Sequence, residues 1–276
     1  MIQWFPGHMT KANREVAAIL KHIDIVIEVR DARIPYASAN PLVQEWVRGK
    51  QHVLVLNKYD LADPVALTHF QQSIPPQMIP ISCVATEKGA RKRVVLACQT
   101  AIQRLAKRHQ LAPHALVVGI PNVGKSQLIN QFKGRSVAKV ANLPGVTRGL
   151  MWIKVTDQLM MVDSPGVLWP KLDPPDVGIK LAIAGAIKPD LLDFEQMTVW
   201  LLDYVKQHYP DALKNGLGIQ ANGEVSEIVS EYAHKRGFLL RGGVLDWERS
   251  CRALIGAFQS GQWGRISLEG GPIQLK

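Results

Sequence analysis

Hydrophobic positions in the first 170 residues fall into short β-branched runs, most of them followed by a longer stretch with helical spacing. The runs are 23–29, 52–56, 78–82, 115–119, 150–156 and 159–162. The predicted helices between them are 41–49, 64–72, 90–109 and 125–133. This alternation predicts an α/β fold, a mostly parallel sheet with helices on both faces and ligands beyond the carboxyl ends of the strands.

The pattern changes near Pro170. Pro170, Pro174 and Pro175 make LWPKLDPPDVG a stiff connector, which does not favour a continuing helix. Helical patterns then occur at roughly 177–187, 195–208, 224–236 and 246–260. With 276 residues the chain is long enough for two domains. We expect an α/β domain over 1–170 and a smaller helical domain over 171–276.

Composition and cysteine usage exclude several classes of protein. Hydrophobic residues make up 47% and charged residues 20%, as in globular proteins, so a disordered or membrane-spanning chain is not expected. The longest apolar runs, such as IDIVIEV, are shorter than a bilayer needs, and MIQWFPGHMTKANRE contains no apolar signal core. Cys83, Cys98 and Cys251 are odd in number and have no C-x-x-C spacing. We therefore expect a cytoplasmic protein without disulfides or a zinc knuckle.

The charge balance points to a polyanionic partner. Lys and Arg number 33 against 23 for Asp and Glu, a net charge of +10 with a sequence pI near 9.6. Residues 1–170 contain 21 basic and 10 acidic side chains, and residues 171–276 contain 12 and 13. The α/β domain therefore carries the whole surplus.

The strongest motif is a phosphate-binding loop. Residues 119–126 read GIPNVGKS, the G-x-x-x-x-G-K-[ST] pattern, directly after the run 115–119 and before the predicted helix 125–133. In such a loop backbone N–H groups surround the phosphates, Lys125 adds charge at the β- and γ-phosphates, and the Ser126 hydroxyl reaches Mg²⁺. Short patterns also arise by chance, but here strand, loop and helix occur together. The expected nucleotide contacts are Asn122, Val123, Gly124, Lys125, Ser126 and Gln127.

A second motif selects the base. Residues 57–60 read NKYD and follow the run 52–56. The Asp60 carboxylate can accept hydrogen bonds from N1–H and the 2-amino group of guanine, where adenine offers an acceptor and a bare carbon. Lys58 can lie across the base, and a backbone contact behind it is expected from residues 82–83. Although a solvated turn is the alternative, we expect a guanine site containing Asn57, Lys58, Asp60, Ser82 and Cys83.

A third motif reads the γ-phosphate. Residues 163–166 read DSPG, the D-x-x-G pattern, in which Asp163 holds Mg²⁺ through water and the Gly166 N–H meets the γ-phosphate. Thr147 is the only Thr between the phosphate-loop helix and the next strand, which makes it the natural second hydroxyl on Mg²⁺. Its loop could order only when a γ-phosphate is present, although a plain Pro-Gly turn also explains LPGVT.

The order of these motifs is unusual, because N-K-x-D precedes the phosphate loop, whereas in ordinary small GTPases it follows. With WFPGHM at the start, RDARIP after the first strand, DSPGVLWP and KRGFLLRGG, nearly the whole chain resembles the circularly permuted GTPases of the RbgA/YlqF family. These proteins act in assembly of the large ribosomal subunit. The resemblance implies a circularly permuted P-loop GTPase fold, GTP hydrolysis with Mg²⁺, and a large-subunit (50S) precursor and its rRNA as partners. We expect a monomer.

Catalysis needs a group that orients the attacking water. Many GTPases use a Gln after D-x-x-G, but here Val167 and Leu168 follow, and neither can bind water. The resemblance implies that a His in the amino-terminal PGHM motif, here His8, replaces it. A His in this position can equally be a docking or capping residue.

Two further positions leave alternatives open, Asn122 in the phosphate loop and Thr147 in the loop before DSPG. In related phosphate loops an Asn like Asn122 lets K⁺ bridge the phosphates, although a loop-stabilising amide is an equal alternative. The family often has another hydroxyl residue beside the Thr at the position of Thr147, whereas here Arg148 and Gly149 follow it. This departure leaves the contacts of that loop open.

Two basic clusters are candidate rRNA contacts. No acidic residue interrupts the first, which consists of Lys88, Arg91, Lys92, Arg93, Arg104, Lys107 and Arg108. It is either a phosphate-binding face or an ordinary solvated helix. The second cluster lies near aromatic residues that suit structured RNA but could equally form core. It consists of Lys235, Arg236 and Arg241, with Arg249 and Arg252 further along the same stretch.

The helical domain follows DSPG within a few residues, so we expect movement of the γ-phosphate-sensing loop to reach it. GTP would then favour rRNA binding, and hydrolysis would release the protein. Two alternatives stay open. One is a nucleotide-sensing RNA-binding module without significant turnover, favoured by the missing Gln, and the other is an ATP-using enzyme, which NKYD opposes.

Overall fold

The computed structural model describes residues 7–105, 112–132, 152–169, 172–187, 193–221 and 223–270, with side chains from Asn13 onwards. Its sheet consists of β1 (Ile25–Asp31), β2 (Gln51–Asn57), β3 (Met78–Cys83), β4 (His114–Gly119), β5 (Trp152–Thr156) and β6 (Leu159–Asp163). The strand order is β3-β2-β1-β4-β6-β5, and every neighbouring pair is parallel except β5 with β6. The predicted α/β fold and all six predicted strands are confirmed.

The topology explains how motifs in permuted order form one site. From β1 the chain moves outward through β2 to β3, and it then returns to place β4 on the other side of β1. The order therefore reverses between β1 and β4, which is where parallel sheets leave a ligand crevice at their carboxyl edge. The loops after both strands meet at this edge, although they are far apart in the sequence.

Helices cover both faces of the sheet. Helices α4 (Ala90–Arg104) and α5 (Lys125–Asn130) pack on the face that contains Ile27 and Val53. On the opposite face lie α1 (Gly7–Ile19), the turn Leu20–His22, α2 (Val43–Trp46) and α3 (Pro64–Gln72). Because successive residues of a strand point to opposite faces, covering both faces requires the near-continuous hydrophobic runs seen in the sequence.

The helices differ from the prediction mainly at their ends. The predicted helix 64–72 matches α3, whereas α4 and α5 end at Arg104 and Asn130. Helix α2 is a single turn, and Gly49, with φ +72°, then turns the chain toward β2. The sequence patterns did not predict α1, because its sequence is mostly polar and, among its described side chains, Val16 and Ile19 are the ones in the buried core.

The second part of the chain is helical, as predicted. It contains α6 (Pro175–Ile183), α7 (Phe194–His208), the π-helical turn Leu213–Leu217, α8 (Val225–Arg236) and α9 (Trp247–Gln259). Pro175 begins α6, so the helix starts two residues earlier than predicted; a Pro at the first helical position removes an N–H that the helix does not use. None of the described helices is both long and apolar enough to cross a membrane.

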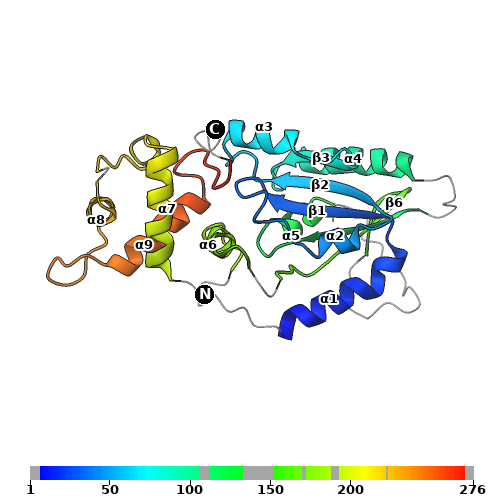
Figure 1. Ribbon diagram of the computed structural model, residues 1–276, viewed down its shortest axis with the longest axis horizontal. Helices are drawn as coiled ribbons and strands as arrows, with labels where there is room; N and C mark the ends of the chain where they lie inside the picture. Colours follow the sequence, from blue (N-terminus) through cyan, green and yellow to red (C-terminus); the bar gives the residue numbers. More distant parts are fainter. Residues whose placement is uncertain are drawn as a thin grey trace.

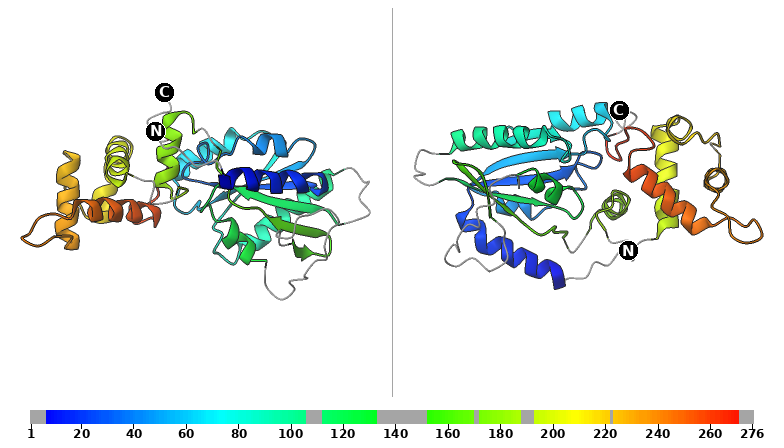
Figure 2. Two further views of the ribbon diagram at one scale, coloured as in Figure 1. Left: turned by 90° about the horizontal axis from the view of Figure 1, so that it is seen from below. Right: turned by 180° about the vertical axis from the view of Figure 1, so that it is seen from behind.

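The helical part lies beyond the carboxyl ends of the parallel strands, with α6 between the sheet and α7–α9 (Figure 1 and Figure 2). After α9 the chain returns to the α/β part, where the backbone N–H of Leu268 donates to the carbonyl oxygen of Arg33 at 2.9 Å. The division at residues 170 and 171 stays a prediction, and the two parts share one hydrophobic core.

Candidate guanine-nucleotide site

The phosphate loop requires glycine where other segments approach it. A Cβ on Gly119 would overlap the carbonyl oxygen of Val29, and a Cβ on Gly124 would overlap the Asn57 amide nitrogen. Gly124 also has φ +104°, a conformation that favours glycine. Helix α5 begins at Lys125, and the side chains of Ser126 and Gln127 are exposed at its start. The loop thus presents a helix N-terminus, which favours anions.

Lys125 is held inside this loop. Its side-chain nitrogen donates to the carbonyl oxygens of Gly119 at 2.9 Å and Ile120 at 2.7 Å. Burial lowers the pKa of Lys125 to about 8, while the Asp163 carboxylate acts in the opposite direction. Phosphate oxygens are stronger acceptors than these carbonyl oxygens, so Lys125 can exchange its partners for a nucleotide.

The D-x-x-G loop lies against the phosphate loop. A Cβ on Gly166 would lie 2.9 Å from Pro121 Cα and 3.0 Å from Lys125 Nζ, so only glycine fits here without a shift. The backbone N–H of Val167 donates to the carbonyl oxygen of Gly119 at 3.3 Å. The structure therefore brings together the two predicted phosphate-binding motifs.

Ser126 and Asp163 fit a nucleotide-bound Mg²⁺. They provide a hydroxyl and a carboxylate close to Lys125, and Mg²⁺ is commonly held by one or two such oxygens together with phosphates. Within the described part of the chain, no group of three His, Cys, Asp or Glu side chains forms a metal site made of protein alone. Thr147, the predicted second hydroxyl ligand, lies outside the described residues.

Asn57 ties three loops together at the base side. Its amide nitrogen donates to the carbonyl oxygen of Val123 at 2.7 Å, and its amide oxygen accepts from the backbone N–H of Ala85 at 2.8 Å. Next to it, Lys58 has φ +59° and donates to the Asp31 carboxylate at 2.9 Å. Asp60, the predicted guanine reader, is exposed. Asn57 thus fixes the loops, and the exposed Asp60 stays the predicted guanine reader.

The segment behind the predicted base position is anchored by Arg93. The Arg93 guanidinium donates to the carbonyl oxygen of Ser82 at 2.9 Å and lies 5.6 Å from the ring centroid of Tyr59. Cys83 is buried, and burial raises the pKa of its thiol to about 11, which keeps it protonated at neutral pH. Arg93, predicted as an rRNA contact, therefore supports the base side of the nucleotide site.

The sequence reasoning assigned no role to Asp31 and Arg33 of the RDARIP segment. The buried Asp31 carboxylate forms ion pairs with Arg33 at 2.8 Å and Lys58 at 2.9 Å. Burial alone would raise the pKa of Asp31, but the charges of Arg33 and Lys58 outweigh it and hold this pKa well below its usual value. The sequence does contain a signal for this ion-paired cluster: charged residues follow directly after the predicted strand 23–29, at the edge of the sheet where ligands are expected.

The phosphate loop is also bonded to the helical part. Asn122, with φ +55°, donates from its amide nitrogen to the carbonyl oxygen of Gly185, just after α6, at 2.7 Å. The Gln259 amide of α9 in turn donates to the carbonyl oxygen of Ile183 at 2.9 Å. A predicted nucleotide contact therefore bonds directly to the helical part.

The positions where many GTPases have Gln face the core. Val167 and Leu168 are 2% and 1% exposed, so their side chains do not line the nucleotide site. His8 lies in the first turn of α1, but its side chain lies outside the described ones. In Figure 1 this end of α1 points toward the carboxyl edge of the sheet, because α1 runs antiparallel to β1.

Several predicted rRNA contacts have partners within the protein. Lys235 donates to the carbonyl oxygens of Leu217 at 2.8 Å and Gly218 at 3.2 Å, which makes it a cap of the π-helical turn. Arg236 lies 5.4 Å from the Tyr232 ring centroid. Arg241 is exposed on the turn between α8 and α9.

The first basic cluster is largely exposed. Lys88, Arg91 and Lys92 are exposed at the start of α4, and Arg91 lies 5.9 Å from the Phe132 ring centroid. Arg104 reaches the carbonyl oxygen of Gln77 at 3.4 Å. Lys107 and Arg108 lie outside the described residues.

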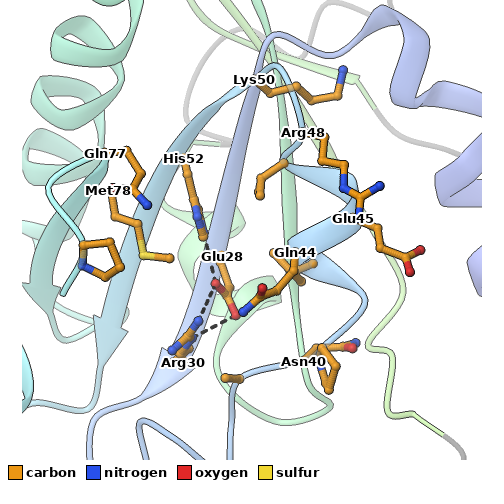
Figure 3. A pocket seen from close by; sticks show the side chains of 15 residues that line it. Glu28, Arg30, Asn40, Gln44, Glu45, Arg48, Lys50, His52, Gln77 and Met78 are labelled. Carbon is orange, nitrogen blue, oxygen red and sulfur yellow. Dashed lines mark hydrogen bonds and ion pairs between the residues drawn. The ribbon is translucent and has the colours of Figure 1, made fainter. Parts of the chain in front are cut away.

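A cavity of about 640 Å³ lies away from these loops (Figure 3). Its lining includes the buried Glu28 carboxylate, which accepts from Arg30 at 2.8 Å and contacts His52 Nε2 at 3.0 Å. None of the predicted nucleotide contacts lines it. Asn40 does, and its amide nitrogen donates to the carbonyl oxygen of Val167 at 3.1 Å. The cavity is thus a neighbour of the D-x-x-G loop and separate from the nucleotide site.

The central strand β4 leads into the phosphate loop, the N-K-x-D loop is bonded to that loop through Asn57, and the D-x-x-G loop packs against Lys125. These features define a P-loop GTPase with its motifs in circularly permuted order. A family model described as 50S ribosome-binding GTPase matches residues 114–224. The fold is also similar to a GDP-bound structure of TM YlqF, with TM-score 0.72 and 26% identity, over 94% of this chain and 100% of that one. GNP-bound YlqF from T. maritima gives a TM-score of 0.71 with 26% identity, over 94% and 97% of the two chains.

Full-length relatives agree with this class. Ribosome biogenesis GTPase A of Bacillus cereus is 37% identical over 98% of this chain and 94% of its own length. The protein of the same name in Thermotoga maritima is 30% identical over 97% and 94%. Mitochondrial ribosome-associated GTPase 1 of Bos taurus is 31% identical over 97% and 88%. The chain belongs to the ribosome biogenesis GTPase A family, and it is a GTPase.

Proposed function

We propose that the protein is a GTP-hydrolysing assembly factor for the large (50S) ribosomal subunit, acting in the cytoplasm as a monomer. It binds a subunit precursor and its rRNA in the GTP state and leaves after hydrolysis. The hydrogen bond of 2.7 Å from Asn122 in the phosphate loop to Gly185 in the helical part carries this proposal, because it joins the nucleotide site to a second surface. The names of the relatives and the net charge of +10 support an rRNA-containing partner.

The γ-phosphate is the signal in this proposal. GTP and GDP differ only there, and the Gly166 N–H is the group proposed to bind it, close to Lys125 and Pro121. The adjoining Val167 is bonded to Gly119 through its N–H and to Asn40 through its carbonyl oxygen. A shift of Gly166 on γ-phosphate binding therefore changes contacts on both sides of the crevice, and a ligand controls two states only through such differential contacts.

Hydrolysis uses positioned charges. Lys125 binds the β- and γ-phosphates, and Ser126, Thr147 and Asp163 hold Mg²⁺, which neutralises charge on the phosphates when bound. Because Val167 and Leu168 are buried, another group must orient the attacking water. His8 is the proposed group, supported by the direction of α1 toward the carboxyl edge of the sheet.

Asn122 is proposed to hold K⁺ at the phosphates. Its amide nitrogen is bonded to Gly185, which directs the amide oxygen of the same group away from that carbonyl and makes it the atom for a cation. We expect faster GTP hydrolysis in KCl than in NaCl, with the difference reduced in Asn122→Asp, where the ligand atom changes, and abolished in Asn122→Ala. Equal rates of the unsubstituted protein in both salts would exclude this site.

The rRNA surface is proposed to include the basic residues exposed on the α/β part, with Arg236 and Arg241 on the helical part. Lys235 and Arg93 contribute less than expected from the sequence, since both have structural partners. Binding to rRNA through phosphate contacts releases counterions, so its affinity falls steeply as the salt concentration rises. Lys92→Glu and Arg241→Glu are therefore expected to weaken subunit binding more than Arg93→Ala does.

The central experiment measures GTP hydrolysis with and without purified large-subunit precursors. We expect stimulation by the precursor and tighter precursor binding with a nonhydrolysable GTP analogue than with GDP. His8→Ala should keep normal GTP affinity and lose most of the stimulated turnover. His69→Ala, which removes an exposed His of α3, is the matched control and should behave like the unsubstituted protein.

Equal precursor binding with GDP and the analogue would contradict the proposed GTP-dependent cycle. Absence of stimulation would favour a nucleotide-sensing RNA-binding module. Retained stimulation in His8→Ala would exclude His8 as the catalytic group and leave the assembly role intact.

A further inference from the structure

The loop that carries Asp60 is bonded on one side to the last described segment of the chain. After α9, Gly261 adopts φ +81°, and a Cβ there would lie 2.6 Å from Leu61 Cδ2. The backbone conformation favours glycine, and an added Cβ would also force the Leu61 side chain to move. From this turn, residues 265–267 run along residues 59–63, about 200 positions away in the sequence, and residues 268–269 continue to residues 33–37.

Arg265 supplies two bonds to this loop. Its Nε donates to the carbonyl oxygen of Ala62 at 2.9 Å, and its Nη2 donates to the carbonyl oxygen of Tyr59 at 3.1 Å. The two acceptors lie one residue before and two residues after Asp60. Because the guanidinium group is planar and rigid, the pair of bonds fixes the distance between these carbonyl groups and hence the curvature of the loop.

Two neighbouring bonds extend this contact. The backbone N–H of Ile266 donates to the carbonyl oxygen of Leu61 at 2.9 Å. The Ser267 hydroxyl accepts from the backbone N–H of Asp63 at 3.1 Å. Asp63 in turn accepts from the N–H groups of Val65 and Ala66 and caps α3. The backbone on both sides of Asp60 is therefore satisfied by protein groups, while the Asp60 side chain is exposed.

The segment is itself firmly packed. Ile266 and Leu268 are 2% and 1% exposed. The Tyr209 hydroxyl donates to the carbonyl oxygen of Ser267 at 3.2 Å, and the Glu269 carboxylate accepts from the N–H groups of Tyr36 at 2.7 Å and Ala37 at 3.0 Å. A segment anchored this way can impose a shape on the loop that it contacts.

We propose that residues 265–269, named here the clamp segment, determine the base specificity of the nucleotide site, with Arg265 as the positioning residue for Asp60. Arg265 touches no nucleotide itself; it holds the backbone from which the Asp60 carboxylate reaches the N1–H and 2-amino groups of guanine. The inference rests on the assignment of Asp60 to guanine recognition. It also makes the helical part a determinant of nucleotide affinity, because the clamp segment is joined to α9 by the short turn 260–264.

The test compares binding of GDP and IDP to Arg265→Ala. Hypoxanthine in IDP lacks the 2-amino group, so Asp60 makes one fewer bond to it and its binding depends less on the position of the loop. We expect the affinity for GDP to fall about tenfold and that for IDP about threefold, so the preference for GDP falls by about threefold. Faster GDP dissociation should account for most of the loss, and Arg265→Lys, with one compact donor group, should restore part of the preference.

Matched variants separate positioning from general damage. Arg48→Ala removes an exposed Arg after α2, away from the nucleotide loops, and should leave both affinities unchanged. Ser267→Ala removes the bond to Asp63 and should lower the GDP preference less than Arg265→Ala does. The thermal unfolding midpoint of each variant is measured alongside.

The outcomes are distinct. Equal weakening of GDP and IDP, or no change in Arg265→Ala, overturns the positioning role. An unsubstituted protein that binds GDP no better than IDP and ADP overturns the guanine site itself and with it the proposed GTP cycle. If Arg265→Ala has a reduced preference for GDP over IDP while Arg48→Ala keeps it, the result supports the role of the clamp segment in positioning Asp60.

Discussion

The base side and the phosphate side of the nucleotide site are built differently. On the base side, Asn57 bonds to Val123 and Ala85, Lys58 bonds to Asp31, and residues 59–63 bond to the clamp segment. On the phosphate side, Ser126 and Gly166 are exposed, and Lys125 bonds only to carbonyl oxygens of its own loop among the hydrogen bonds of the described residues.

This difference separates two tasks. The groups proposed to select the base are already held by protein contacts, so little reorganisation would be needed when guanine binds. The groups proposed to sense the phosphates would exchange weak partners for a nucleotide, so we expect their arrangement to change with the γ-phosphate. Substitutions on the base side should therefore affect stability and base choice, and those on the phosphate side should affect phosphate-dependent binding.

The largest effect is expected from Asp31→Ala on the base side. It leaves Arg33, which is 1% exposed, and Lys58 without their shared carboxylate. Removing one partner of a buried ion pair costs about 3–5 kcal/mol, so the free energy of unfolding, measured by urea titration, should fall by about that amount. Asp157→Ala, which removes an exposed partner of Lys154, is the control and should leave the midpoint unchanged.

The same carboxylate has a predictable pH dependence. The pKa of Asp31 in the folded protein is below its ordinary value of 3.8, so its stabilising contribution is complete above about pH 4 and is lost as the pH falls further. Asp31→Asn should therefore show a weaker loss of stability on acidification than the unsubstituted protein. Identical acid profiles would show that this ion-paired cluster does not stabilise the fold.

Lys125→Ala, on the phosphate side, should have a large effect on nucleotide affinity rather than on stability. Removing the positive charge at the phosphates is expected to weaken GDP and a GTP analogue alike, by about 100-fold. Because the hydrogen bonds of the Lys125 ammonium to described residues go to loop carbonyl oxygens and burial lowers its pKa, the unfolding midpoint should change little. Titration calorimetry and urea unfolding measure the two quantities. A stability loss as large as that of Asp31→Ala would remove the distinction between the two sides.

Gly166→Ala should give the smallest of these effects. The added Cβ would lie 2.9 Å from Pro121 Cα, so the D-x-x-G loop must move away from the phosphate loop. We expect about a tenfold loss of affinity for a GTP analogue and less than a twofold change for GDP. Gly89→Ala is the matched control, since a Cβ there meets no atom within 4 Å. Equal losses for GDP and the analogue would contradict a γ-phosphate role for Gly166.

Much of the fold was predictable because its signals are local. Six β-branched runs became six strands, since strands covered on both faces need apolar residues at nearly every position. Helix α3 matched its predicted ends because Asp63 caps it and Pro64 begins it. Helix α1 was missed because its sequence is mostly polar, with Val16 and Ile19 in the core among its described side chains.

The nucleotide motifs were equally readable, but their supporting residues were not. GIPNVGKS, NKYD and DSPG place their chemistry in consecutive residues, so each can be recognised without a fold. Arg93 belongs to a basic run that suggested RNA, and its structural role follows from its contacts with Ser82 and Tyr59 in the folded protein. Lys235 is a similar case, because the π-helical turn that it caps has no clear sequence signal.

The sequence by itself determined the α/β class, the permuted order of the motifs and the residues predicted to contact a guanine nucleotide, because periodicity and short motifs are encoded over a few neighbouring positions. The tertiary structure alone decided which residues hold those motifs in place. Asp31 meets Lys58 across adjacent strands, Asn122 meets Gly185 after α6, and Arg265 meets the NKYD loop across about 200 residues. Such contacts follow from strand order and packing, which no local pattern specifies.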